Sequence, residues 1–342
     1  MAIIEICNIF AEKFSDMDKI IGIGNVLVDV MVRLDDDRLL DEFCLPKGSM
    51  QLIDDEKYRR ISRKFATMRT YMATGGSACN VMLALANLGA PVGIVGKIGR
   101  DELGAFFRRN SIEHGIDIRL EESDLPSGVA STFISPDGQR TFGTYLGAAG
   151  AMSADDLHAD SFRGFSYLYI EGYLVQDHAL VIRACELARA AGMKVCYDLA
   201  SYNIVEADRD FITHILNEYV DIVFANEDEA RAFAGEGDAL ADLARRCEVA
   251  VVKVGSRGAY IRRGQEQVHV PAMDVPQVVD TNAAGDFFAA GFLYGYMRGC
   301  PLEACGRIGS QLSGHVIQIV GTALPREAWN EIKLNIRTIW PE

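Results

Sequence analysis

Short apolar runs alternate with helical patterns through the second half of the chain. The runs are rich in β-branched and aromatic residues and cover residues 167–170, 194–197, 221–224 and 250–254. Between the first two, apolar residues recur at helical spacing over 179–191, and Gly192 follows as a helix C-cap. Strand, helix and strand in this rhythm predict right-handed crossovers and a mainly parallel sheet that helices cover on both faces.

The first half of the chain holds a similar unit that is interrupted. Residues 20–23 are predicted to form the first strand, and residues 92–95 a later one. Before the later strand, residues 77–88 carry apolar side chains on one helical face, and Gly89 follows as a C-cap. The sequence therefore predicts an α/β fold built as a three-layer, doubly wound, mainly parallel sheet.

Two stretches of alternating polar and apolar residues have no helices to cover them. They span residues 27–34 and 131–146, and a Pro-Asp-Gly turn at 136–138 makes the second a hairpin signature. We predict a small antiparallel β lid over a cleft, formed by two insertions at about 26–55 and 128–148. Lids exclude water from reacting phosphates; the alternative interpretation is a surface hairpin without such a role.

The composition is that of an ordinary globular protein. The 342 residues include 48 acidic and 34 basic side chains, which give a formal net charge of −14. This charge argues against a general affinity for nucleic acid or for an anionic membrane, so an anionic ligand needs a local site. With no low-complexity tract or long linker, residues 1–342 are predicted to form a single domain.

The sequence favours a cytoplasmic protein with reduced thiols. No run of 18 apolar residues occurs, and the amino terminus carries Glu5 and Glu12 rather than the basic flank of a signal sequence. The eight cysteines contain no CxxC pair, which predicts reduced core thiols rather than a metal or disulfide framework. They are Cys7, Cys44, Cys79, Cys185, Cys196, Cys247, Cys300 and Cys305.

The segment 280–286, Asp-Thr-Asn-Ala-Ala-Gly-Asp, is the most informative for chemistry. Its small residues Ala283, Ala284 and Gly285 directly precede a stretch with helical apolar spacing. Small side chains at a helix N-terminus let backbone N–H groups face outward, where the helix dipole adds partial positive charge. The pattern predicts an anion hole that fits a phosphate group.

Asp286 stands at the edge of this predicted anion hole, in the first turn of the helix. An ionised carboxylate there can accept the proton of an attacking hydroxyl group, and phosphoryl transfer to an alcohol needs such a base. The alternative is that Asp286 only caps the helix, since Asp is a favoured cap residue.

Residues 280–293 closely resemble the second signature of the PfkB, or ribokinase-like, kinase family, with Ala283 in place of a more common Gly. The resemblance implies the ribokinase-like fold, the use of ATP and Mg²⁺, and Asp286 as the catalytic base. It also implies that the three small residues of the anion hole stabilise the transferring phosphoryl group.

A second resemblance indicates a substrate-binding site. Residues 74–80, Thr-Gly-Gly-Ser-Ala-Cys-Asn, look like the family's first signature. Gly75 and Gly76 allow close backbone approach to a small ligand, and Asn80 offers both a donor and an acceptor to a sugar hydroxyl. Without the other signature, the double glycine would indicate only a turn.

Asp29 follows the first strand at the spacing where the family uses an Asp to bind two substrate hydroxyls. A carboxylate that accepts two O–H hydrogen bonds is suited to a sugar diol. The rival interpretation is a dinucleotide fingerprint that begins at Gly22. That motif needs a third glycine where Leu27 stands, and a helix where a strand pattern follows.

Two further resemblances imply the nucleotide side of the site. Asn226 and Glu229 match the family's NxxE motif and would hold hydrated Mg²⁺, which prefers oxygen ligands. Taken alone, they indicate an acidic first turn of a helix. Lys253, Gly255 and Gly258 resemble the nucleotide-side loop, whose backbone is expected to line the ATP groove.

Four more residues have less specific assignments. Thr281, within the second signature, is placed on the nucleotide side, and whether a monovalent cation such as K⁺ binds near Asp280 stays open. Glu171, at a strand end, falls near a substrate-contacting Glu of ribokinases, or is a solvated loop carboxylate. Arg140 lies in the lid hairpin, where it meets phosphate charge or, as we favour, is an exposed strand residue.

The sequence motifs are less specific for the molecule that accepts the phosphoryl group than for the phosphoryl transfer itself. Residues 24–29 and 75–80 look more like adenosine and nucleoside kinases than like ribokinases, which carry Lys after the double glycine where this chain has Ser77. We predict an ATP-dependent kinase that phosphorylates a primary hydroxymethyl group of an adenosine-like nucleoside, with a ribose- or fructose-type sugar kinase as the alternative.

Two rivals from other classes are a ligand-binding protein that has lost catalysis and a dinucleotide oxidoreductase. The partners are then a small-molecule acceptor and ATP, in a monomer or a homodimer paired through the lid edges.

Overall fold

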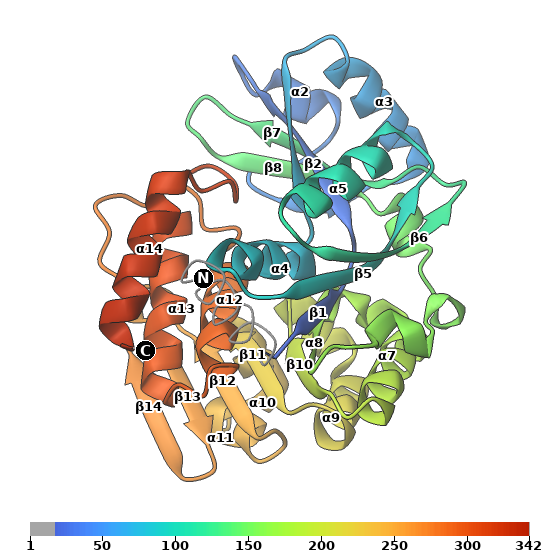
Figure 1. Ribbon diagram of the computed structural model, residues 1–342. Helices are drawn as coiled ribbons and strands as arrows, with labels where there is room; N and C mark the ends of the chain where they lie inside the picture. The colour runs from blue at the N-terminus through green and yellow to red at the C-terminus, as the bar shows by residue number, and fades with distance from the viewer. Residues whose placement is uncertain (1–17, 342) are drawn as a thin grey trace, which may run out of the picture.

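The computed structural model describes residues 18–341, and a nine-stranded sheet forms its centre (Figure 1). The strands are β1 (Ile20–Ile23), β5 (Val92–Gly99), β6 (Asp117–Ser123), β9 (Tyr167–Glu171), β10 (Lys194–Asp198), β11 (Ile222–Asn226), β12 (Val249–Lys253), β13 (Ala259–Arg263) and β14 (Glu266–Val270). Their order is β14-β13-β12-β11-β10-β9-β1-β5-β6. Neighbours from β12 to β6 pair in parallel, whereas β13 and β14 are antiparallel additions at one edge. The prediction of a mainly parallel sheet is confirmed.

Alternation along the strands explains why helices cover both faces of this sheet. In β1, Ile20 packs into one hydrophobic core and Ile21 into another, because successive strand side chains point to opposite faces. The first core includes residues of α4 (Ser77–Leu88), α12 (Ala284–Tyr296), α13 (Leu302–Val316) and α14 (Arg326–Ile339). The second includes residues of α7 (His178–Ala190), α8 (Tyr202–Ala207), α9 (Arg209–Glu218), α10 (Glu227–Ala234) and α11 (Ala239–Ala244). The three-layer architecture is therefore confirmed.

A second, five-stranded sheet stands off the first at the position predicted for the lid, and we call it the lid (Figure 1). Its strands, in order, are β3 (Met50–Leu52), β8 (Arg140–Tyr145), β7 (Gly128–Ile134), β2 (Leu27–Arg33) and β4 (Thr70–Gly75). Helices α2 (Arg38–Glu42) and α3 (Asp55–Phe65) bury a small core with Val32 and Phe133. Helix α5 (Glu102–Glu113) contacts β6, β2 and β4, and so connects the two sheets, while the short α6 (Gly147–Gly150) follows β8.

The lid differs from the prediction in three ways. The sheet is mixed rather than antiparallel, because the β2–β7 and β3–β8 pairs run parallel. Helices α2 and α3 cover part of it, although the pattern suggested no helix there. The sheet also includes β4, up to Gly75 and beyond the first segment predicted at about 26–55, because β4 pairs with residues 27–32 of β2. The hairpin between β7 and β8 forms as expected, with Gly138 at a φ of 86° in the turn.

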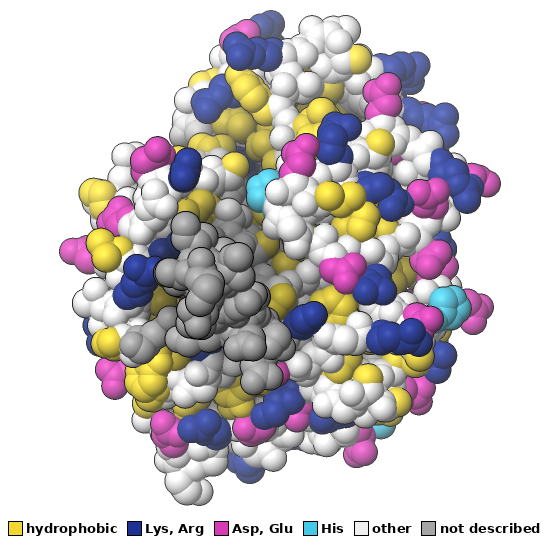
Figure 2. Space-filling view, viewed as in Figure 1, with side chains coloured by type: hydrophobic (Ala, Val, Ile, Leu, Met, Phe, Trp, Pro, Cys, Tyr) yellow, Lys and Arg dark blue, Asp and Glu magenta, His cyan; other side chains and the backbone are white. Residues whose placement is uncertain are grey.

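The thiols and the surface agree with most of the sequence interpretation. Among residues 18–341 no cysteine forms a disulfide, and all the cysteines there are buried except the exposed Cys44, for which the core prediction is wrong. Cys7, Glu5 and Glu12 lie outside the described residues. Figure 2 shows Lys and Arg interspersed with Asp and Glu over one face of the molecule. Within residues 18–341, no helix combines the length and the apolar character that crossing a bilayer requires.

Candidate functional site

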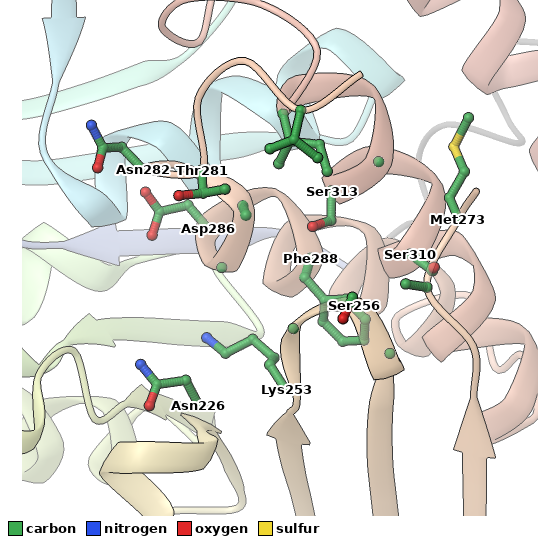
Figure 3. A pocket seen from close by; sticks show the side chains of 18 of the residues that line it. Asn226, Lys253, Ser256, Met273, Thr281, Asn282, Asp286, Phe288, Ser310 and Ser313 are labelled. Atoms are coloured by element: carbon green, nitrogen blue, oxygen red, sulfur yellow. The ribbon is translucent and has the colours of Figure 1, made fainter. Parts of the chain in front are cut away.

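A cavity of about 870 Å³ opens at the carboxyl ends of β10, β11 and β12, beside the N-terminus of α12 (Figure 3). In open α/β sheets, ligands bind outside these strand ends. Its lining includes most of the residues predicted for the nucleotide and phosphoryl sites: Asn226, Glu229, Lys253, Gly255, Gly258, Thr281, Ala284, Gly285 and Asp286. The fold thus gathers the second signature, the NxxE motif and the glycine loop around one hollow.

The residues predicted for the acceptor lie beside this cavity rather than in its lining, and α4 connects them to Asp286. Asn80 Nδ2 donates a hydrogen bond to Asp286 Oδ2 over 2.8 Å, and Ser77 Oγ donates to Asp286 Oδ1 over 2.7 Å. Both donors belong to the first turn of α4, which packs against α12. These two bonds orient the carboxylate and join the first signature to the second.

The N-terminus of α12 offers free backbone donors. Its N-cap is Ala283, and no side chain caps the helix. Ala284 N donates to Thr281 O over 3.1 Å, but the N–H groups of Gly285 and Asp286 have no acceptor among the described residues. At the predicted anion hole, the N–H groups of Gly285 and Asp286 are therefore the free donors, whereas the turn itself uses the N–H of Ala284.

Asp286 does not act as a cap of its own helix. Burial raises its pKa to about 7, although the hydrogen bonds from Asn80 and Ser77 oppose the shift. Its carboxylate accepts hydrogen bonds from another helix, not from the first turn of its own. A carboxyl group with a pKa near neutrality is suited to accept and release a proton at physiological pH.

Asp29 lies in β2 next to the double glycine of β4 and α4. A Cβ at position 75 would come within 2.3 Å of Asp29 Oδ1, so Gly75 is required for this close approach. Gly76 has a φ of 98° and is the N-cap of α4, which favours glycine there. Burial raises the pKa of Asp29 to about 6, and the nearby Arg140 guanidinium opposes the shift. The glycines thus bring a carboxylate close to the start of α4.

Asn80 keeps one polar atom unused. Its Nδ2 is bound to Asp286, but its Oδ1 is buried and has no hydrogen-bond partner among the described residues. A buried acceptor without a donor costs free energy, so such an atom calls for an explanation. A hydroxyl group of a ligand would supply the missing donor.

Asn226 and Glu229 form a capping box at the start of α10. Asn226 N donates to Glu229 Oε2 over 2.7 Å, and Glu229 N donates to Asn226 Oδ1 over 2.9 Å. Burial and the neighbouring Asp198 raise the pKa of Glu229 to about 7, and Lys253 opposes the shift. Within residues 18–341, no three His, Cys, Asp or Glu side chains gather as metal ligands. Asn226 Nδ2 also donates to Glu229 Oε1 over 2.6 Å, so each side-chain oxygen of the pair accepts one hydrogen bond and keeps further lone pairs. These lone pairs and the crowded negative charge fit Mg²⁺ held through water.

Glu171 is not the solvated loop carboxylate that one interpretation of the sequence expected. It is buried, and its Oε1 accepts hydrogen bonds from Asn25 N and Asn25 Nδ2 over 2.9 Å each. Its Oε2 accepts a bond from Ala78 N over 3.0 Å, in the first turn of α4. Both oxygens thus accept hydrogen bonds from the chain itself, and through them Glu171 braces the N-terminus of α4.

Glu171→Ala is expected to lower the free energy of unfolding by about 2–3 kcal/mol, because the buried N–H groups of Asn25 and Ala78 lose their acceptor. Denaturant unfolding monitored by circular dichroism measures the change. Asp177→Ala, which removes the N-cap of α7, is the comparison and should cost about 1 kcal/mol. Equal losses in the two variants would contradict the bracing role.

The structure also corrects the expectation that Arg140 is exposed. Its side chain is 8% exposed, and Arg140 Nη1 lies 2.9 Å from Asp280 Oδ2. Asp280 also accepts hydrogen bonds from Asn282 N and Gly321 N. A lid residue therefore contacts the loop that leads into the anion hole.

Sequence reasoning missed two residues of the site. Asp198 ends β10, and its Oδ2 accepts a hydrogen bond from Lys253 Nζ over 2.9 Å. The predicted strand at 194–197 stops one residue earlier, so the rule that ligands bind at the ends of parallel strands could have found it. Ser77 was noted only as a marker of substrate class. Its bond to Asp286 depends on the docking of α4 against α12, which no local pattern reports.

Comparison with known proteins decides the family. The sequence pattern of the pfkB family carbohydrate kinases matches residues 49–329. The chain belongs to this family. A probable sugar kinase from Rhizobium etli is 32% identical, with a TM-score of 0.83 over 93% of this chain and 98% of that one. The adenosine kinase of Sinorhizobium meliloti is also 32% identical, with a TM-score of 0.82 over 93% and 99% of the two chains. Adenosine kinase 1 of Arabidopsis thaliana is 28% identical over 342 residues, 92% of this chain and 98% of that protein.

The protein is therefore a kinase of the PfkB family with the ribokinase-like α/β fold, as the two signatures indicate. Its relatives include both sugar kinases and adenosine kinases. The use of ATP and Mg²⁺ goes with the family in general. Membership of this kinase family argues against the two alternative functions, a binding protein without catalysis and a dinucleotide oxidoreductase.

Proposed function

We propose that this PfkB kinase transfers the γ-phosphoryl group of ATP to a primary hydroxymethyl group of an adenosine-like nucleoside. The observation that carries the proposal is the contact of Asp286 with Ser77 and Asn80. It places one carboxylate between the free amides of α12 and the residues predicted for the acceptor. A base in that position can serve an alcohol on one side and a phosphoryl group on the other.

The chain's own residues would act in sequence. Asp29 and Asn80 Oδ1 accept hydrogen bonds from the acceptor hydroxyls and point its hydroxymethyl group at Asp286. Asp286 takes the proton as the hydroxyl oxygen bonds to the γ-phosphorus, and ADP leaves with the electron pair of the broken P–O bond. The N–H groups of Gly285 and Asp286 stabilise the negative charge of the transferring group.

Two other parts of the molecule would support the transfer. Asn226 and Glu229 would hold hydrated Mg²⁺, which when bound neutralises part of the charge on the nucleotide phosphates. The ion pair of Arg140 with Asp280 holds the lid against the loop of the anion hole. A lid in that position excludes water, so the phosphoryl group passes to the acceptor instead of being hydrolysed.

The cleft side of the lid favours a nucleoside over a free sugar. Strand pairing places several large apolar side chains on the same face as Asp29: Met31, Met50, Leu52, Tyr71 and Phe142. Leu52 is 56% exposed and Tyr71 44% exposed, although both are apolar or aromatic. Exposed apolar surface beside a hydroxyl-binding carboxylate suits a flat heterocyclic base attached to the sugar. A free sugar would leave this surface uncovered.

A thermal-shift panel tests the acceptor class. Adenosine, other nucleosides, ribose and fructose are each added with a non-hydrolysable ATP analogue, and adenosine is expected to raise the melting temperature most, because ligands stabilise the folded state by mass action. Leu52→Asp should reduce the shift caused by adenosine and keep the shift caused by the ATP analogue alone. Stabilisation by a sugar but not by adenosine would transfer the assignment to a sugar kinase.

The rate is expected to rise with pH through about 7. Burial raises the pKa of Asp286 to about 7, so the base is protonated below that pH and ionised above it. The value of kcat/KM for the acceptor, measured from about pH 5 to about pH 9, should increase and then level off near pH 8. Circular dichroism at each pH controls for unfolding. A profile that stays flat down to about pH 5, as for an ordinary Asp, would contradict the base assignment.

A further inference from the structure

The positively charged ammonium group of Lys253 lies near the N-terminus of α12. It is the last residue of β12, where it pairs with Asn226 of β11, and its side chain is only 14% exposed. Figure 3 shows the side chain reaching from the strand end toward the space between Asn226 and Asp286. A Cβ added at Gly285 would lie 3.1 Å from Lys253 Nζ. The sequence assigns only the backbone of this residue to the nucleotide groove, but its ammonium group lies beside the free amides of the anion hole.

The surrounding charges hold the ammonium group in this place. Lys253 Nζ lies 2.9 Å from Asp198 Oδ2, and Glu229 and Asp286 are close enough to act on it electrostatically. Among the described residues that line the cavity, Lys253 is the one basic side chain. A terminal phosphate that enters the anion hole brings more negative charge to the same spot. It therefore needs a positive partner, and Lys253 is positioned to be that partner.

We propose that the Lys253 ammonium binds the terminal phosphoryl group of the nucleotide at the anion hole, and that Asp198 is the positioning residue that holds it there. This inference rests on the proposed phosphoryl site at Gly285. In the transfer, the acceptor oxygen bonds to the γ-phosphorus while the bond to the β–γ bridging oxygen breaks. ADP keeps that electron pair and Asp286 takes the acceptor's proton. Lys253 donates to a non-bridging oxygen of the moving group and, with the amides, balances its charge.

A purely structural role would give different behaviour. If Lys253 only neutralised Asp198 and Glu229, its removal would affect folding and would weaken every nucleotide equally or not at all. A ligand of the terminal phosphoryl group must instead discriminate between nucleotides with and without that group. The difference in affinity between a triphosphate and a diphosphate is therefore the diagnostic quantity.

The test uses the whole chain and no acceptor. Lys253→Met alone leaves Asp198 buried without its counter-charge, so it is combined with Asp198→Asn, which removes that charge as well. Calorimetry measures the Kd of ADP and of β,γ-imido-ATP in the presence of Mg²⁺. The double variant is expected to bind the imido analogue about 10- to 100-fold more weakly than the wild type, the range for one hydrogen bond to a charged group. Its affinity for ADP should change by less than about two-fold, because ADP lacks the group that Lys253 binds.

Lys97→Met combined with Asp156→Asn is the matched control. The Lys97–Asp156 pair is also 2.9 Å long and similarly buried, but neither residue lines the cavity, so both Kd values should stay as in the wild type. Equal weakening of both nucleotides in the Lys253 variant, or no weakening, would overturn the assignment of Lys253 and leave the proposed function in place. A wild type that binds neither nucleotide would overturn both.

Discussion

Asp286→Asn will lower kcat for the phosphorylation of adenosine by about 10³-fold or more, because an amide cannot accept the proton of the attacking hydroxyl. In the proposed complex, Asp29 and Asn80 make the contacts that place the acceptor, and these remain in the variant. The Kd of adenosine should therefore change little. Steady-state kinetics with saturating ATP gives the first quantity and calorimetry the second, and the two together separate catalysis from binding.

Folding provides the control for this variant. Burial raises the pKa of Asp286 from 3.8 to about 7 in the folded protein. The stability that the protonated group contributes is therefore present at low pH and is lost as the pH rises through about 7. A neutral Asn avoids this loss, so the melting temperature of the variant at about pH 8 should equal or exceed that of the wild type. A folded variant with near-normal kcat would refute the role of Asp286 as the base.

Asp29→Asn is expected to lower kcat/KM for the acceptor by about 10²–10³-fold, mainly through KM, because hydrogen bonds to a charged group contribute about 1.5–3 kcal/mol each. The ionised carboxylate can accept two hydroxyl donors, whereas the amide offers one acceptor oxygen and turns two donors toward the sugar. Initial rates at varied adenosine concentration measure the effect.

Asp137→Asn is the matched control for Asp29. Asp137 also belongs to the lid, in the turn between β7 and β8, but its side chain is 58% exposed and pairs with Lys47 at the surface. Surface ion pairs contribute little, so this variant should behave as the wild type. The Kd of ADP should be unchanged in both variants. An Asp29→Asn enzyme with the wild-type KM would remove Asp29 from the acceptor site.

The central sheet and the uncapped N-terminus of α12 could be predicted because each leaves a local pattern. Strand β1 is buried on both faces and is therefore a continuous apolar run, while α4 ends where Gly89 adopts a left-handed conformation at its C-cap. Both elements have the boundaries that the sequence indicates, 20–23 and 77–88. The free amides of α12 follow from small residues before a helix, which is also a local feature.

What could not be predicted depends on contacts between distant segments. The ion pair of Arg140 with Asp280 joins the lid to the loop of the anion hole, and nothing in either local sequence reports the other partner. The hydrogen bond from Ala78 N to Glu171 Oε2 also joins two distant segments, so no local pattern predicts it. Strand β4 was missed because it is an exposed edge strand with little apolar alternation, and the double glycine at its end indicates only a turn.

The most direct measurement is ³¹P NMR of a reaction that contains the protein, MgATP and adenosine. The wild type is expected to convert ATP and adenosine in equal amounts into ADP and adenosine 5′-phosphate, and Asp286→Asn is expected to leave both substrates unchanged over the same time. Hydrolysis of ATP to ADP and inorganic phosphate without a phosphorylated nucleoside, or turnover by Asp286→Asn at the wild-type rate, would contradict the account.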